Sequence, residues 1–332
     1  MSRKISSIII LIIVCVSCKS EPEVHLNYSK GEAFGTTFSA QFIDTKELDL
    51  SNSYDSIIDV INTSMSTYIQ SSDISRINKG DTTVVIDMHF EKVFTTSKRI
   101  YKETAGVFDP TIGVLVNAWD FGPKGKIKSL DSLKIDSLLG SVGLQKVVLS
   151  KRRIVKENPD TFIDFNALAK GYAVDVFANF LEDKGVQNYL VEIGGEIRGK
   201  GSNVMKQKPW RIGVEDPNFD DTQSYSKILS LHDEAMATSG SYRKYKMDEQ
   251  GNRYAHIINT ETGYPLKSNL LSVSILTNTC MEADAYATAL MSMGLERSKK
   301  FLETHPELKV YFIYEDQDKE LKTLSVNGFP KE

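Results

Sequence analysis

The sequence contains little cysteine, which excludes a fold stabilised by disulfides. Of three cysteines in 332 residues, Cys15 and Cys18 lie near the N-terminus, and only Cys280 lies beyond them. With Cys15 in an export signal and Cys18 at its cleavage point, Cys280 has no later cysteine to pair with in an exported protein. A large apolar core must provide the stability instead, and roughly 310 residues are enough to build one. The hydrophobic content of 41% is consistent with such a core.

Several motifs that would indicate other functions are also absent. No Gly-x-Gly-x-x-Gly run follows an expected strand, which argues against a Rossmann dinucleotide site. No Gly-x-Ser-x-Gly elbow is present, since Ser239 lies in Ala-Thr-Ser-Gly, and no Cys/His group has zinc spacing. The formal charge is −4, and no basic stripe stands out, which argues against nucleic acid as a partner.

The N-terminal residues are typical of a secretory signal. Arg3 and Lys4 precede a mostly apolar run over residues 5–16, which is too short to span a bilayer. The following Ser17-Cys18 pair resembles a bacterial lipobox, although Cys15 is unusual at its first position. Residues 1–17 are therefore expected to be a lipoprotein signal peptide, whose removal would take the formal charge from −4 to −6.

A lipid on Cys18 would anchor the mature chain to a membrane without crossing it. The polar residues 18–30 then form a tether, and residues 31–332 form the functional domain. We expect an exported protein, anchored to a membrane and facing the periplasm. The alternatives are an ordinary signal peptide or a signal anchor.

Apolar periodicity predicts one α+β unit with two lobes, in which helices flank mixed or antiparallel sheets. Helices are expected over residues 55–62, 88–105, 167–181, 281–293 and 296–303, with Asp87 capping the second of them. Strands are expected over residues 146–149, 153–156, 162–164, 189–193, 211–214, 228–231, 254–258, 271–276, 309–314 and 322–326.

The expected helix over residues 281–293 carries the most informative pair of polar residues. Asp284 and Thr288 are four apart and therefore project from the same face, about one turn from each other. A carboxylate and a hydroxyl are hard oxygen donors that suit Mg²⁺. The alternative is an ordinary solvated helix face.

Three other segments combine turn residues with groups that could contact a ligand. Lys170 lies in the first turn of a helix that follows Asp164, where exposed amides and a positive charge favour an anion. Residues 106–122 offer Trp119 and Phe121 as flat apolar surface, although a buried aromatic cluster needs no ligand. His256 is the best candidate base among five histidines, although a structural role on a strand is the simpler interpretation.

These segments occur together, in order, in one known family. From about residue 30 to the end, the chain resembles the ApbE family of FAD:protein FMN transferases. The matching words are Phe34-Gly35-Thr36, Met65-Ser66-Thr67-Tyr68, Phe108-Asp109-Pro110-Thr111, Asp164 with Ala169-Lys170-Gly171-Tyr172, Ile193-Gly194-Gly195-Glu196, Ala237-Thr238-Ser239-Gly240, His256-Ile257-Ile258, and Glu282-Ala283-Asp284-Ala285 with Thr288.

The resemblance implies a T-fold-related domain that uses Mg²⁺ and takes FAD as substrate. The metal would be held by Asp284, Thr288 and the backbone carbonyl of Ala167, and His256 would be the catalytic base. FAD would lie against Phe34, Tyr68, Val107, Phe108, Asp109, Asp164, Lys170 and Ile258. The acceptor would be a threonine of a membrane redox subunit, such as one of an NADH:quinone reductase.

The chain departs from the family at two positions near these residues. Asn166 stands where a glycine or serine is common, and Asn259 stands where an aspartate is common. Two other functions remain open on the sequence alone: an FAD pyrophosphatase that releases FMN and AMP, and a lipid-anchored flavin-binding protein without catalysis.

Overall fold

The computed structural model describes residues 23–125, 127, 130–217, 224–241, 245–247 and 253–330. The predicted signal peptide and lipidated Cys18 lie outside these residues. No helix in the described part of the chain has the length and apolar character needed to cross a membrane.

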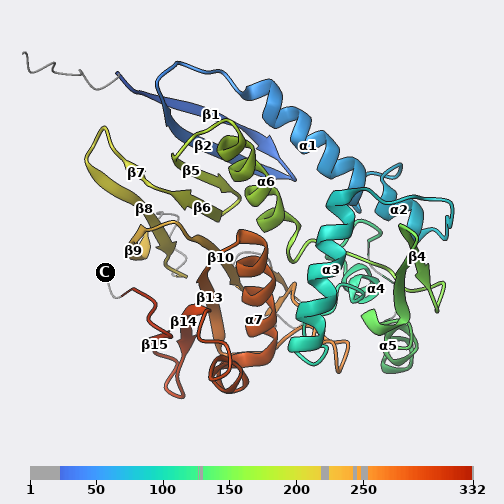
Figure 1. Ribbon diagram of the computed structural model, residues 1–332. Helices are drawn as coiled ribbons and strands as arrows, with labels where there is room; N and C mark the ends of the chain where they lie inside the picture. The colour runs from blue at the N-terminus through green and yellow to red at the C-terminus, as the bar shows by residue number, and fades with distance from the viewer. Residues whose placement is uncertain are drawn as a thin grey trace, which may run out of the picture.

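An eight-stranded antiparallel sheet forms the centre of the molecule (Figure 1). Its order is β1-β2-β5-β6-β10-β13-β14-β15, so most neighbours along the sheet are also near neighbours in sequence. The strands are β1 (His25–Ala33), β2 (Thr36–Asp44), β5 (Asn188–Ile193), β6 (Glu196–Lys200), β10 (Ala235–Gly240), β13 (Leu270–Thr277), β14 (Lys309–Glu315) and β15 (Leu321–Val326).

Helices cover one face of this sheet and enclose the main core. Figure 1 shows α6 and α7 side by side over the sheet, with α1 and α3 beyond them. The core contains fully buried aromatic side chains such as Tyr54, Phe177 and Phe312. These four helices are α1 (Ser51–Met65), α3 (Met88–Glu103), α6 (Ala169–Asp183) and α7 (Cys280–Leu302).

A small second sheet covers the opposite face. It consists of β7 (Ser202–Asn203), β8 (Lys208–Glu215) and β9 (Tyr225–Leu231), and it buries Trp210 and Leu229 against Met236 and Leu276. A separate pair, β11 (Tyr245–Met247) and β12 (Arg253–Ala255), precedes the His256 segment.

The second lobe lies beside α3 and contains the remaining short elements (Figure 1). Leu115, Ile135, Val142 and Ile258 form its own small core. Its elements are α2 (Asp73–Asn78), α4 (Gly113–Ala118), α5 (Ser132–Leu139), a 3₁₀ turn at Leu144–Lys146, β3 (Val147–Ser150) and β4 (Arg153–Lys156).

The α+β prediction is confirmed, and so is the helix start at Asp87. The Asp87 carboxylate accepts a hydrogen bond from the Phe90 N–H, which satisfies a donor at the start of α3. The two helices expected over residues 281–293 and 296–303 are also confirmed, because α7 consists of two helices that meet at a kink at Gly294, where φ is +73°.

Three predicted boundaries are wrong. Residues 25–30, assigned to a tether, belong to β1, which pairs along its whole length with β2. Residues 162–164 form no strand, because the Asn78 side chain bonds to both the N–H and the C=O of Ile163. The strand expected over residues 254–258 ends at Ala255, so His256 lies in a bend.

Candidate functional site

The first turn of α6 packs directly on the start of α7, and Gly171 makes this approach possible. A Cβ placed on Gly171 would lie 2.3 Å from the Cys280 carbonyl oxygen and 2.9 Å from the Asp284 Cβ. Only glycine allows two backbones to come this close. The Gly171 N–H consequently donates a 3.1 Å hydrogen bond to Asp284 Oδ2.

Asp284 is a buried carboxylate, so a solvated helix face does not explain it. Its side chain is 5% exposed. Burial raises the pKa of Asp284 to about 8; the Lys170 ammonium opposes this rise, and the Glu196 carboxylate adds to it. One turn further along α7, the half-buried Thr288 has its Oγ1 3.1 Å from Ser239 Oγ on β10.

The carbonyl of Ala167 is left available as a third oxygen donor. In a regular helix the Gly171 N–H would donate to the carbonyl four residues earlier, that of Ala167. Here it donates to Asp284, while the Tyr172 N–H donates to Leu168. No backbone N–H in the described part of the chain donates to the Ala167 oxygen.

Lys170 does not project freely into solvent, because it forms an ion pair with Glu196. Glu196 is the first residue of β6 and is 3% exposed, and its Oε2 accepts no hydrogen bond within the described residues. Glu192, on the neighbouring strand β5, is also close enough for the charge of Glu196 to raise its pKa, after burial as the main cause. The Lys170 ammonium therefore contacts one carboxylate, that of Glu196, and its charge acts on two more, those of Asp284 and Glu192.

This excess of negative charge fits a hydrated Mg²⁺ ion. Among the residues described there is no cluster of three or more His, Cys, Asp or Glu side chains that could hold a metal ion. A carboxylate, a hydroxyl and a carbonyl are nevertheless the hard donors that Mg²⁺ accepts, with waters completing its shell. Those waters would also supply the donor that the buried Oε2 of Glu196 lacks.

Asp164 lies at the other end of the segment that leads to Lys170. It is buried, and burial raises its pKa to about 6, while hydrogen bonds from Asn166 oppose the rise. Its N–H donates to the Pro110 carbonyl at 2.8 Å. Tyr68 is 60% exposed, and its pKa is raised by burial and by the charge of Asp164, so the two side chains lie near each other.

The loop over residues 106–111 is held by its own side chains. Asp109 accepts hydrogen bonds from the Thr111 N–H and hydroxyl at 2.8 and 2.6 Å, and from the Leu144 N–H at 3.3 Å. Val107 and Phe108 are buried. These contacts give the three residues a structural role, and their predicted contact with flavin stays a prediction.

The His256 segment packs onto this same loop. Thr260 Oγ1 donates to the Gly106 carbonyl at 3.0 Å, and Ile258 is buried in the small core. His256 is half-buried, with its ring centroid 6.3 Å from that of Phe121. The same loop accepts the Asp164 N–H through the Pro110 carbonyl, so the His256 segment and Asp164 contact one loop.

Phe34 occupies the tight turn between β1 and β2. Phe34 and Gly35 both have positive φ, +53° and +77°, as a two-residue hairpin turn requires. A Cβ on Gly194, in the β5–β6 turn, would lie 2.7 Å from Thr36 Cγ2, so the two turns are adjacent. Phe34 therefore lies near the strand end that presents Glu196.

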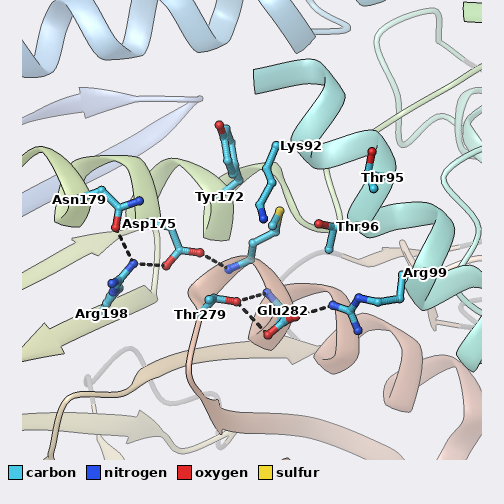
Figure 2. Close-up of a pocket in the computed structure, with 11 residues that line it drawn as sticks. Lys92, Thr95, Thr96, Arg99, Tyr172, Asp175, Asn179, Arg198, Thr279 and Glu282 are labelled. Carbon is cyan, nitrogen blue, oxygen red and sulfur yellow. Dashed lines mark hydrogen bonds and ion pairs between the residues drawn. The ribbon is translucent and has the colours of Figure 1, made fainter. Parts of the chain in front are cut away.

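A pocket of 470 Å³ lies between α3, α6 and the start of α7, but none of the predicted site residues line it (Figure 2). Asp175 lies there and accepts hydrogen bonds from the Cys280 and Met281 N–H groups at 3.0 and 2.9 Å. Arg198 pairs with Asp175 at 3.1 Å. These groups are engaged with one another, so we assign them the role of capping α7.

Glu196, Asp175 and Ser239 were not predicted from the sequence. Glu196 and Asp175 read as ordinary polar positions of a strand and a helix, and their partners lie on other elements. The only local feature that could have indicated Glu196 is its place directly after Gly194-Gly195. A tight turn of two glycines puts the next residue at one end of the sheet.

Comparisons with known proteins all match the same family, and they do so over most of the chain. The profile of the ApbE family matches residues 34–312. The FAD:protein FMN transferase of Haemophilus influenzae is 33% identical over 344 residues, covering 100% of this chain and 98% of the relative. That of Vibrio cholerae serotype O1 is 36% identical over 312 residues and covers 90% of each.

Solved structures show the same fold. The flavin transferase ApbE from Vibrio cholerae superposes with a TM-score of 0.81 at 33% identity, covering 91% of this chain and 97% of that one. The apo form of Pseudomonas stutzeri flavinyl transferase ApbE also gives 0.81, at 27% identity and with coverage of 91% and 95%.

Proposed function

Because the chain belongs to the ApbE family and is an FAD:protein FMN transferase, we propose that it moves FMN to a threonine hydroxyl in a magnesium-dependent reaction. The observation that carries this proposal is the junction of α6 and α7. There Asp284, the free carbonyl of Ala167 and the Lys170–Glu196 pair lie around one glycine contact. Oxygen donors and a cation in one place suit a pyrophosphate and its metal ion.

The residues of this junction would act by positioning and by charge. Asp284, Thr288 and the Ala167 carbonyl would hold Mg²⁺, which when bound neutralises charge on the FAD phosphates. Lys170, at the start of α6, would contact the same phosphates together with the helix amides. Asp164, Tyr68 and Phe34 lie on the elements around this junction and are proposed to contact FAD.

The proposed reaction breaks the phosphoanhydride bond of FAD and forms a phosphate ester bond to threonine. The threonine oxygen attacks the FMN-side phosphorus, the pyrophosphate P–O bond breaks, and AMP leaves with the electron pair. His256 would take the hydroxyl proton, a contribution of about 10²- to 10⁴-fold in rate for a well-placed base. Asp284 is less suited to that role, because its carboxylate would be bound to the metal.

We propose membrane redox subunits as the acceptors, for example subunits of an NADH:quinone reductase. This choice rests on the family resemblance and on the predicted signal peptide. A lipid on Cys18 would hold the enzyme at a membrane, close to membrane-bound acceptors.

The metal assignment is tested with Asp284→Ala. We expect this change to abolish FMN transfer and to remove the response to added Mg²⁺, measured as AMP release and as flavin fluorescence of the denatured acceptor. Asp59→Ala, on the exposed side of α1, is the matched control and should retain both. Unchanged turnover of Asp284→Ala would refute the metal assignment.

A further inference from the structure

Two buried carboxylates, those of Glu196 and Asp284, attract the Lys170 ammonium. It pairs with Glu196, and its charge also acts on Asp284, whose Oδ2 is bonded to the next residue, Gly171. Opposite charges attract strongly where water is excluded. A lysine without a fixed partner would therefore move to Asp284 and neutralise the carboxylate that the cation requires.

We propose that Glu196 is a positioning residue that holds the Lys170 ammonium away from Asp284 and so keeps Asp284 available for a divalent cation. The inference rests on the proposed function and names a residue that neither the sequence pattern nor the family resemblance assigned to the site.

The backbone around Glu196 is rigid enough for this task. Glu196 pairs with Ile193 directly across a two-residue turn, in which Gly194 and Gly195 have φ of +60° and +100°. The Gly195 N–H donates to Glu192 Oε1 at 2.6 Å, which fixes the turn further. The glutamate is thus attached to the sheet, whereas Lys170 and Asp284 are attached to helices.

The two oxygens of Glu196 have different surroundings. Oε1 contacts Lys170, while Oε2 is buried without a partner among the described residues. A buried acceptor that lacks a donor is unusual in a folded protein. In the loaded site a water of the hydrated cation would supply that donor, so Glu196 would hold Lys170 with one oxygen and support the cation's shell with the other.

A simpler alternative is that Glu196 acts only as a negative charge at a distance. The two explanations differ in how far the effect of Glu196 depends on Lys170. If Glu196 acts mainly by restraining the lysine, most of the effect of its loss disappears once Lys170 is removed, and only the smaller contribution of Oε2 to the cation's shell remains. If it acts by charge alone, its loss weakens cation binding by the same factor with or without Lys170.

The test is a double-mutant cycle of Mn²⁺ binding with and without FAD. Binding is measured by the electron paramagnetic resonance signal of the free ion. The proteins are wild type, Glu196→Gln, Lys170→Met and the double variant. We expect Glu196→Gln to weaken Mn²⁺ binding roughly tenfold in the wild-type background and at most about twofold in the Lys170→Met background. Equal weakening in both backgrounds, or none in the first, overturns the proposal.

Two further variants keep the result interpretable. Glu196→Asp retains the charge but shortens its reach, so it should weaken Mn²⁺ binding if position matters and leave it unchanged if only charge matters. Glu234→Gln breaks the Lys309–Glu234 pair elsewhere on the sheet and should leave binding unchanged. Circular dichroism melting identifies any variant that fails to fold.

Failure of the proposed function would look different. A wild-type protein that binds no Mn²⁺ with or without FAD would remove the cation from the mechanism, and this inference with it. A wild-type protein that binds Mn²⁺ and transfers FMN, but shows equal weakening in both backgrounds, would overturn the role of Glu196 alone.

Discussion

At the level of single residues, the candidate site combines buried carboxylates with an exposed aromatic side chain. Asp284, Glu196 and Asp164 are almost completely buried, whereas Tyr68 is 60% exposed. Burial of a carboxylate raises its pKa and costs stability at neutral pH. In the proposed function, this cost is offset when the carboxylates bind a cation and a flavin.

Asp164 provides a stability test of this cost. Its pKa rises from 3.8 unfolded to about 6 folded, so the folded state prefers the protonated form. The penalty is absent below pH 3.8, grows up to about pH 6 and is complete above it. Asp164→Asn should therefore stabilise the protein at pH 8 by up to about 3 kcal/mol.

The measurement is urea unfolding at pH 8 and near pH 3, where both states are protonated and the difference from wild type should vanish. Asp59→Asn, at an exposed position, serves as the control. Lower stability of Asp164→Asn at pH 8 would show that the charged carboxylate is stabilised by its hydrogen bonds with Asn166.

His256 allows a separate test of catalysis. Replacing it with alanine should lower the rate of transfer about 10²- to 10⁴-fold, because the threonine hydroxyl loses its base. FAD binding, measured by flavin fluorescence, should be retained, since His256 is proposed to act on the acceptor hydroxyl and not to hold FAD. Loss of FAD binding would instead identify His256 as a flavin contact.

At the scale of elements, α7 depends on a cap supplied by another helix. Asp175 of α6 accepts the N–H groups of Cys280 and Met281 and pairs with Arg198 of β6 (Figure 2). One carboxylate thereby fixes three elements, and these carry Lys170, Glu196 and Asp284.

Asp175→Ala should destabilise the protein by about 1–3 kcal/mol, because the first N–H groups of α7 lose a buried acceptor, while Arg198 keeps its ion pair with Glu182. Chemical denaturation measures this. Asn179→Ala removes an exposed contact of the same arginine and should cost less than about 1 kcal/mol. Comparable losses for the two variants would contradict the capping role of Asp175.

The sequence predicted local features well and contacts between elements poorly. The Asp87 cap and the helical spacing of Asp284 and Thr288 depend on neighbours within one turn, so both were readable. The position of Glu196 depends on a sheet and a helix meeting, and no local pattern encodes that. The segment 162–164 was mistaken for a strand because Asn78, which satisfies its backbone, is more than 80 residues away.

At the scale of the whole molecule, the candidate site lies where the two lobes meet. The sheet and α7 provide Glu196, Asp284 and Thr288, while the second lobe provides the 106–111 loop and the support for His256. The segment from Asp164 to Lys170 joins the two groups.

The central claim is FMN transfer to a protein, and intact mass spectrometry of an acceptor fragment incubated with the enzyme, FAD and Mg²⁺ tests it most directly. We expect a gain of one FMN less one water that disappears with EDTA and when the acceptor threonine is replaced by alanine. An unchanged acceptor mass, with free FMN and AMP accumulating, would contradict it and identify a pyrophosphatase.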